Sequence, residues 1–237
     1  MAEGRAPESQ GLVRLPLDAF GGEYWLADIT GRADSAALET LSPRERARAA
    51  RFVFAEHRHR FELAHAALRF VLAARLGISA AQVEFVEGPH GKPSLAPDID
   101  LAFNMSHSDS LALIMLAQVP RGSEIGVDIE ALRPVKDARS LAAAHFTRNE
   151  QAELEACPPD ESDRLFLSGW TRKEACLKAV GSGLSIAPST FECGLAPVRA
   201  KTRIATPAGI AHVDADSIAI GRGHLAAAAI AFTTAAA

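Results

Sequence analysis

Apolar residues recur along the chain at two spacings, which separate the expected helices from the expected strands. Between residues 61 and 72, apolar side chains fall three or four positions apart, as in a helix packed on one face. Short apolar or alternating runs predict strands at 24–29, 83–86, 101–105, 111–117 and 125–130, with several more within 190–233. Residues 1–22 are expected to form a loose lead-in. The mixture favours an α+β fold.

Polar residues mark where the two longest helical regions begin and end. The first opens with S-P-R-E (42–45), a capping box with proline at the first helical position, and ends at Gly77, with room for a break near His57. The second opens with T-R-N-E (147–150) and ends at Gly181, so cap and glycine are 35 residues apart in one region and 34 in the other. This weak repeat predicts two similar α+β halves: residues 1–120 and 121–237.

The composition is that of an ordinary folded protein and excludes several functional classes. Of the 237 residues, 48% are hydrophobic and 23% charged, and the net charge of −4 provides no general attraction to nucleic acid. No apolar run approaches the ~18 residues of a membrane-spanning helix, and the N-terminus lacks the apolar core of a signal peptide. The three cysteines have neither disulfide-framework nor zinc spacing, so we expect a protein of the reducing cytoplasm. From the net charge and the absence of a long apolar run, we expect that it binds neither nucleic acid nor membranes.

Three carboxylates and one lysine are the strongest candidates for chemistry. In a strand over 125–130, Asp128 and Glu130 share a face, and in a helix Glu174 and Lys178 share a face. Carboxylates without a nearby Cys or His ligand suit a hard cation, above all Mg²⁺, and the lysine suits phosphate oxygens. Each pair alone is also compatible with a solvated strand edge or a surface helix pair. Together they predict magnesium-dependent chemistry on a phosphate ester.

A second group of polar residues lies before a turn and in a loop. Ser106 and His107 are suited to donate hydrogen bonds to phosphate, and Lys92, in a Gly- and Pro-rich loop, suits a point-charge phosphate contact. A Ser–His nucleophile pair is disfavoured, because neighbouring residues in a strand point to opposite faces. A capped strand end and a solvated loop lysine remain the alternatives.

The first helical region is rich in basic residues. Most of its arginines are expected to form a solvated helix face: Arg44, Arg46, Arg48, Arg51, Arg58, Arg60 and Arg69. His57, His59 and His65 also fall at helical spacing. Without a matching pattern of carboxylates, these histidines do not predict a metal site.

Four short motifs, in this order, resemble those of the 4′-phosphopantetheinyl transferases. They are G-K-P (91–93), F-N-x-S-H-S (103–108), G-V-D-I-E (126–130) and W-x-x-K-E-x-x-x-K (170–178). The length and the two-half outline are similar to the surfactin-synthetase-activator type, in which one chain forms a pseudo-two-fold pseudo-dimer. The resemblance implies this fold, with coenzyme A contacts in residues 1–120 and the metal-binding carboxylates and catalytic helix in residues 121–237.

The resemblance also implies an activity, namely transfer of the 4′-phosphopantetheine arm of coenzyme A to a serine of an acyl or peptidyl carrier protein, with release of 3′,5′-ADP. Coenzyme A is then the co-substrate, Mg²⁺ the cofactor and the apo carrier the partner of a monomeric enzyme. By motif position, Mg²⁺ would be held by Asp128, Glu130 and Glu174. Glu174 would also deprotonate the serine hydroxyl, directly or through water, while Lys178 offsets charge on the transferred group.

The coenzyme A contacts follow from the same resemblance. Six side chains are implied: Lys92, Ser106, His107, Arg51, His59 and Arg60. The family often carries a lysine where this chain has Glu45, which here fits the acid position of the capping box. Arg44 or Arg46 is the expected substitute for that lysine.

Two other functions fit the same residues. A magnesium-dependent phosphohydrolase, acting on coenzyme A or a related phosphate ester, would need the same carboxylates, with water in place of the carrier serine. A non-catalytic coenzyme A or carrier-binding protein is disfavoured, because all three carboxylates and Lys178 are retained. The motifs do not identify the carrier, which fits fatty-acid, polyketide, nonribosomal-peptide or aminoadipate-reductase chemistry.

Overall fold

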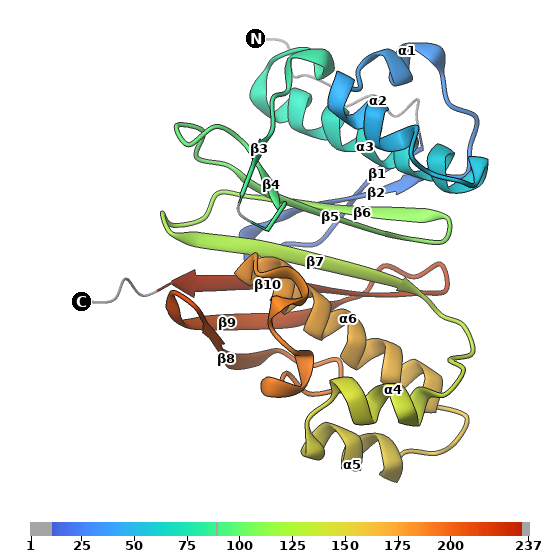
Figure 1. The fold of residues 1–237 in the computed structure, drawn as a ribbon, viewed down its shortest axis with the longest axis vertical. Coiled ribbons are helices and arrows are strands. Elements are labelled where there is room, and N and C mark those ends of the chain that lie inside the picture. Colours follow the sequence, from blue (N-terminus) through green and yellow to red (C-terminus); the bar gives the residue numbers. More distant parts are fainter. Residues whose placement is uncertain (1–10, 89, 234–237) are drawn as a thin grey trace.

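Two antiparallel sheets and two long helices make up the framework of the protein (Figure 1). The computed structural model describes residues 11–88 and 90–233. Helix α3 (Ala55–Leu76) covers one sheet, helix α6 (Ser162–Val180) covers the other, and the two sheets pack against each other between the helices. The architecture is therefore α+β with two sheet-containing halves, which confirms the predicted fold class.

The first half contains a four-stranded antiparallel sheet with the strand order β1-β2-β6-β5. Its strands are β1 (Leu12–Leu15), β2 (Glu23–Asp28), β5 (Ala102–Ser108) and β6 (Leu111–Ala117). Around the sheet lie α1 (Ser35–Glu39), α2 (Pro43–Ala49), α3, the short 3₁₀ helices η2 (Ala19–Gly21) and η3 (Ala80–Gln82), and a two-stranded sheet of β3 (Val86–Glu87) and β4 (Pro93–Ser94). Every residue of the central strand β6 is buried.

The second half contains a four-stranded antiparallel sheet with the order β7-β10-β9-β8. Its strands are β7 (Ser123–Ala131), β8 (Ala200–Thr206), β9 (Gly209–Ile218) and β10 (His224–Thr233). Its helices are α4 (Ala138–His145), α5 (Arg148–Ala156), α6, η4 (Gly183–Ser185) and η5 (Pro188–Thr190). In β10, Ala227, Ala229 and Ala231 pack against α6, and their small side chains let the helix lie close to the sheet.

Alternation along β6 and β7 divides the apolar core into layers. The even-numbered residues of β6 pack toward α3, and the odd-numbered ones pack between the two sheets. The same inter-sheet core receives Ile125, Val127 and Ile129 from β7. Because successive residues of a strand point to opposite faces, Gly126 and Asp128 turn to the other side, where α6 lies. The predicted division at residue 120 falls in the turn between β6 and β7; that it separates two domains stays a prediction.

The two sheets meet where their edge strands β5 and β7 lie side by side (Figure 1). Side chains of β5 bridge this seam. The Asn104 side-chain oxygen accepts a hydrogen bond from the Val127 N–H at 2.9 Å, and the Ser108 hydroxyl oxygen accepts one from the Ala131 N–H at 3.1 Å. The residue numbers of the bonded partners rise together, from 104 and 127 to 108 and 131, so β5 and β7 run parallel. Polar side chains thus satisfy backbone N–H groups at the edge of β7.

Each half contains a capping box whose glutamate is buried against a cation on the following long helix. In the first half, the Glu45 carboxylate accepts a hydrogen bond from Arg69 Nε at 2.8 Å. Arg69 is 1% exposed and also donates to the carbonyl oxygens of Ala80 and Val83. Its guanidinium lies over the Phe85 ring. The buried charge is therefore both paired and hydrogen-bonded, as burial requires.

The second half repeats this arrangement. Glu150 is the acid of the capping box that opens α5, and the Lys173 ammonium of α6 lies 2.8 Å from its carboxylate. Lys173 is fully buried and donates to the carbonyl oxygens of Pro188 and Phe191. Both long helices end at a glycine in the left-handed conformation: Gly77 and Gly181. The repeat seen in the sequence thus extends to individual buried ion pairs.

Several sequence expectations differ from the structure. Each expected helical region consists of two helices, α2 and α3 in the first half and α5 and α6 in the second, and the first break lies at residues 50–54, before His57. Within the expected lead-in, residues 12–15 form β1, which pairs with the edge of β2 although only its first residue is buried; residues 1–10 lie outside the described residues. The strand expected at 83–86 is reduced to β3, because the carbonyl of Val83 accepts a hydrogen bond from Arg69 instead of joining a ladder. Arg69 is not part of a solvated face, because residues 80–85 cover it.

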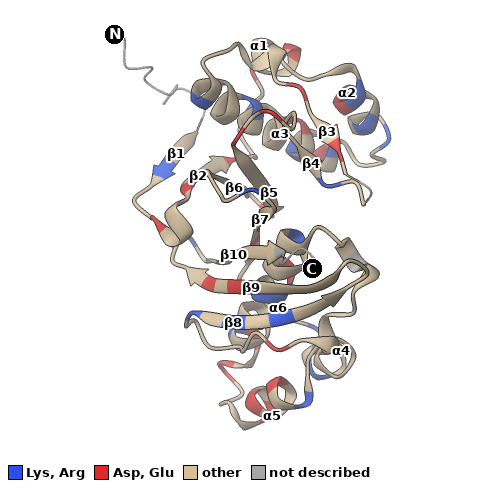
Figure 2. Ribbon diagram, turned by 90° about the vertical axis from the view of Figure 1, so that its left-hand side faces the viewer, with Lys and Arg blue, Asp and Glu red and all other residues tan. Residues whose placement is uncertain are grey.

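The surface charges are distributed unevenly between the halves (Figure 2). Helix α5, at the foot of the molecule, carries three glutamates and one arginine, whereas α2, at the top, carries three arginines and one glutamate. Within residues 11–88 and 90–233, no helix is long and apolar enough to span a bilayer. The basic groups near α2 therefore form a local feature of an otherwise acidic chain.

The buried Glu45 carboxylate is expected to make the fold sensitive to acid. Burial alone would raise its pKa, but hydrogen bonds from His65 and Ser42 and the charge of Arg69 outweigh burial and lower the pKa from 4.5 to about 2. A carboxylate whose pKa is lowered by folding stabilises the folded state above its unfolded-state pKa. That contribution, about 3 kcal/mol, should be lost as the pH falls from 4.5 toward 2.

Replacing Glu45 with Gln tests this expectation. The free energy of unfolding, measured by urea denaturation at pH values from about 6 down to 3, should depend less on pH in Glu45→Gln than in the wild type. The exposed Glu39 provides the matched control, and Glu39→Gln should follow the wild-type curve. Parallel curves for wild type and Glu45→Gln would contradict the role of this carboxylate.

Candidate active site

The candidate active site lies on the face of β7 that α6 covers. Gly126 permits the close approach of this helix, because a Cβ atom there would overlap the Ala175 carbonyl oxygen and the Ala179 nitrogen. The next residue on the same face is Asp128. Lys178 reaches it from α6. A position without a side chain in β7 thus brings the charged residues of strand and helix together.

Asp128 is held by Lys178 and Ser106. Lys178 Nζ donates to Asp128 Oδ1 at 2.7 Å and to Ser106 Oγ at 2.8 Å, and the Ser106 hydroxyl donates to the same Oδ1 at 2.8 Å. Asp128 is 5% exposed, and its other oxygen, Oδ2, is buried without a hydrogen-bond partner in the described part of the chain. A buried carboxylate oxygen without a donor is unfavourable, so this atom is available to a cation.

Glu130 and Glu174 add two carboxylates near Asp128. Glu130 Oε2 accepts a hydrogen bond from the Ser108 hydroxyl at 3.0 Å. Burial, and after it the charge of Asp128, raise the pKa of Glu130 against the effect of that hydrogen bond. Burial and the charges of Asp128 and Glu130 likewise raise the pKa of Glu174, although Lys178 opposes them. Carboxylates that repel one another in this way are stabilised by a shared cation.

These three carboxylates influence one another but do not yet form a closed set of metal ligands. Among the residues that the structure describes, no group of three Asp, Glu, His or Cys side chains is positioned to hold a metal ion. The unpartnered Asp128 oxygen, the raised pKa values of both glutamates and the all-oxygen donor set still fit a hard divalent cation such as Mg²⁺. The residues present therefore fit the metal that the sequence resemblance implies.

Ser106 and His107 point to opposite faces of β5, so His107 is exposed and Ser106 is buried. Partial burial, followed by the positive charge of four neighbouring basic groups, lowers the pKa of His107: Lys178, His65, Arg60 and Arg48. The charges of basic side chains from α2, α3 and α6 thus act on the same residue, which favours an anion nearby. The opposite orientations of Ser106 and His107 also agree with the argument against a Ser–His nucleophile pair.

Lys92 reaches β7 instead of open solvent. Its Nζ donates to Glu124 Oε2 at 2.7 Å and to the Ile125 carbonyl oxygen at 3.0 Å, and its side chain is 16% exposed. Burial lowers the pKa of Lys92 in spite of the nearby Glu124 charge. This lysine ties the loop between β3 and β4 to the start of β7. A contact between Lys92 and phosphate would therefore replace its bond to Glu124.

The three other implied coenzyme A contacts lie near the start of α3. Arg60 pairs with Asp109 in the turn between β5 and β6, at 3.3 Å. His59 Nε2 lies 2.7 Å from the Gly31 carbonyl oxygen, and Arg51 is exposed in the link between α2 and α3. Of these three residues, Arg60 is among the groups whose charge lowers the pKa of His107.

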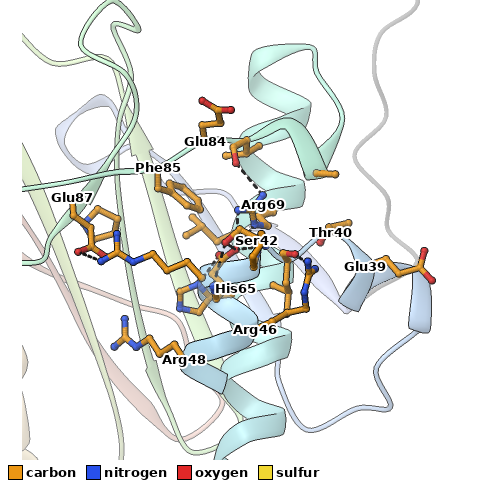
Figure 3. Close-up of a pocket in the computed structure, with 18 of the residues that line it drawn as sticks. Glu39, Thr40, Ser42, Arg46, Arg48, His65, Arg69, Glu84, Phe85 and Glu87 are labelled. Atoms are coloured by element: carbon orange, nitrogen blue, oxygen red, sulfur yellow. Dashed lines mark hydrogen bonds and ion pairs between the residues drawn. The ribbon is translucent and has the colours of Figure 1, made fainter. Parts of the chain in front are cut away.

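A pocket of about 570 Å³ lies between α2, α3 and the β3–β4 loop (Figure 3). Both signs of charge line it: Arg44, Arg46, Arg48, His65 and Arg69, with Glu39, Glu45, Glu84 and Glu87. Several of these groups pair with each other, as Arg44 does with Glu87 and Arg69 with Glu45. The pocket thus combines paired charges with apolar residues such as Leu41 and Phe85, and the buried pair of Arg69 and Glu45 forms part of its wall.

Arg48 differs from the paired arginines of this pocket. Its guanidinium lies over the Phe61 ring, and its side chain extends from α2 away from the buried pairs (Figure 3). Gly91 and Pro93, on either side of Lys92, line the same pocket. The pocket therefore adjoins both the G-K-P loop and the basic groups around His107.

Sequence reasoning assigned no individual role to Asn104, Ser108 or Gly126, although each belongs to a quoted motif. Asn104, Ser106 and Ser108 alternate along β5, so one polar face of this strand bridges to β7. Their spacing of two was the signal for that bridge. The need for glycine at position 126 has no such local signal, because it depends on how closely α6 packs.

Comparison with family models covers both halves of the chain. A model described as 4′-phosphopantetheinyl transferase, N-terminal, matches residues 30–119. A second, for the 4′-phosphopantetheinyl transferase superfamily, matches residues 124–229, which include α6 and all of β7 except its first residue. The matched segments thus contain the strands and helix that form the site.

Several relatives point to the same family. The 4′-phosphopantetheinyl transferase HetI of Nostoc sp. is 40% identical over 177 residues, which cover 73% of this chain and 69% of that protein. Sfp of Bacillus subtilis is 29% identical over 175 residues, covering 73% and 75%. AcpT of Escherichia coli is 43% identical over 99 residues, covering 41% and 49%. Since motifs, fold, family models and relatives agree, the chain belongs to the 4′-phosphopantetheinyl transferase superfamily.

Proposed function

We propose that this protein transfers the 4′-phosphopantetheine arm of coenzyme A to a serine of an apo acyl or peptidyl carrier protein, with Mg²⁺ as cofactor and 3′,5′-ADP as the second product. One observation carries the proposal. Lys178 pairs with Asp128 at 2.7 Å, and its charge acts both on Glu130 and Glu174 and, together with other basic groups, on His107. A cation site next to an anion site suits a reaction at a metal-bound diphosphate ester.

Asp128, Glu130 and Glu174 would hold the metal, which as a Lewis acid would neutralise charge on the diphosphate oxygens. Lys178 offers its ammonium group to the oxygens of the transferred phosphoryl group. In the transfer, the seryl oxygen forms a bond to the phosphorus next to the pantetheine arm, and the diphosphate P–O bond breaks. The 3′,5′-ADP leaves with the bonding electrons, and Glu174 accepts the seryl proton, directly or through water. The nucleophile belongs to the carrier.

Coenzyme A would extend from these carboxylates toward the pocket beside α2. The pocket volume, about 570 Å³, falls in the range of small-molecule sites, and Arg48 lies at its edge near the basic cluster. Basic groups at this position suit the phosphates of the nucleotide end. Arg44 and Arg46, the expected substitutes for the missing lysine at position 45, line the same pocket.

Intact-mass measurement on a panel of apo carriers tests the proposal. Incubation with coenzyme A and Mg²⁺ should add one phosphopantetheine group to at least one acyl or peptidyl carrier and release an equal amount of 3′,5′-ADP. A phosphohydrolase would release 3′,5′-ADP and leave every carrier unmodified. That result would refute the transferase and leave hydrolysis in its place.

Lys92→Ala and His107→Ala are expected to weaken coenzyme A binding more than they slow turnover. A lost charged hydrogen bond corresponds to ~1–3 kcal/mol, so the KM for coenzyme A should rise about 5- to 100-fold. Because Lys92 also bonds Glu124 in the structure, Glu124→Gln serves as the control for that structural bond. An unchanged KM for coenzyme A in both alanine variants would contradict these contacts.

A further inference from the structure

An apolar segment is exposed on the surface beside the candidate active site. Between α2 and α3, the side chains of Phe52, Val53 and Phe54 belong to residues that are 38%, 90% and 65% exposed. We call these three consecutive residues the apolar link. Large apolar side chains gathered in water are unfavourable, and such a patch marks a surface that a partner covers.

Basic residues surround the apolar link. Residues 44–60 contain six arginines and two glutamates, a net charge of +4 in a chain whose overall charge is −4. Arg51 and Arg58, on either side of the link, are exposed. Arg58 is paired with Glu62 at 2.8 Å, whereas Glu45 is buried and does not offset Arg51 at the surface. The surface is therefore complementary to a partner that carries acidic residues around apolar ones.

The apolar link is continuous with the active site. The ring centroids of Phe52 and Phe61 are 5.4 Å apart, and those of Phe61 and the His65 imidazole are 4.0 Å apart. His65 and Arg60 belong to the basic groups whose charge lowers the pKa of His107. In Figure 1, the link between α2 and α3 and the turn between β5 and β6 lie on the same side of the molecule, and Arg60, near the start of α3, pairs with Asp109 in that turn at 3.3 Å. Ring contacts thus connect the link to His65, one of the residues whose charge acts on His107.

We propose that the apolar link and its arginine rim form the docking surface for the apo carrier protein, with acidic and apolar side chains of the carrier packed on it. The inference rests on the proposed function and adds the surface by which the second substrate is recognised. An anionic membrane or a second copy of this chain could also cover a basic apolar patch. Neither of these would have to lie next to the groups that act on a serine, whereas a carrier must.

Val53→Asp and Phe54→Asp test the docking surface. Phe54 occupies the N-cap position of α3 with extended backbone angles, where aspartate is favourable, so this variant should fold as well as the wild type. Each variant should raise the KM for the apo carrier about tenfold or more, with the KM for coenzyme A unchanged. The matched control is Val198→Asp, at a 63% exposed valine of the second half, which should behave like the wild type.

Binding without turnover separates this inference from the proposed function. Labelled apo carriers of the acyl and peptidyl types, titrated with the full chain in the absence of coenzyme A, should bind the wild type and lose about tenfold in affinity with either link variant. Carrier binding that depends on the link without any transfer would support docking and refute the transferase. Wild-type binding to no carrier, or unchanged carrier affinity in both variants, would overturn the docking surface.

A vesicle experiment decides between the carrier and a membrane. Sedimentation with phosphatidylglycerol vesicles should leave the wild-type protein in the supernatant. Vesicle binding that the wild type shows and both link variants lose would overturn the docking inference, because the link would then be a membrane contact.

Discussion

Glu174→Gln is expected to lower kcat by about 10²–10⁴-fold even at saturating Mg²⁺, coenzyme A and carrier, the usual contribution of a general base. An amide oxygen still coordinates a hard cation, but an amide cannot accept the seryl proton. Glutamine matches glutamate in size, so packing on α6 should be preserved. The measurement is kcat as a function of Mg²⁺ concentration, and we expect a plateau far below the wild type.

Asp128→Asn provides the comparison for a residue that is proposed to act only through the metal. Its loss of activity should be recovered in part by high Mg²⁺, because asparagine weakens a ligand and leaves the base intact. The variant also weakens the pairing with Lys178 and Ser106, so its folding must be checked by circular dichroism. If Glu174→Gln recovers fully at high Mg²⁺, Glu174 is a ligand alone and the base lies elsewhere.

Gly126→Ala is expected to have the largest effect on stability. The added methyl group would overlap backbone atoms of α6, which cannot turn aside as a flexible side chain can. The helix must move away from β7, and this movement should cost about 3 kcal/mol or more. It should also separate Lys178 from Asp128 and remove most of the activity. Urea denaturation and kcat measure the two effects.

Gly31→Ala is the matched control for that substitution. A Cβ atom at Gly31 meets no other atom within 4 Å, so this variant should keep the wild-type stability within about 0.5 kcal/mol. Wild-type stability of Gly126→Ala would show that α6 does not need to lie this close to β7. It would remove the argument that glycine sets the geometry of the site.

Much of the fold follows from local signals that a sequence displays directly. The capping boxes at Ser42 and Thr147 open the short helices α2 and α5 as expected, and Gly77 and Gly181 end the long helices that follow them, α3 and α6, in the left-handed conformation that glycine favours. The alternation of β7 directs its apolar residues to the core between the sheets and Asp128 to the other face. Short-range geometry alone decides such features, so the two-half α+β outline was predictable.

Features that depend on packing between distant segments were not predictable in this way. Arg69 reads as one more exposed arginine, yet the segment after α3 buries it against Glu45. The burial of Lys173 likewise depends on segments outside its own helix, namely Glu150 of α5 and the carbonyl oxygens of Pro188 and Phe191.

The sequence by itself determined which residues could carry the chemistry, because motif order and strand or helix spacing identify Asp128, Glu130, Glu174 and Lys178. The tertiary structure alone decided how they meet. Lys178 and Ser106 are 72 positions apart, and their contact exists because Gly126 lets α6 lie against β7 while polar residues of β5 join the two sheets. Charge pairing and burial act through space, so their partners depend on packing and not on spacing along the chain.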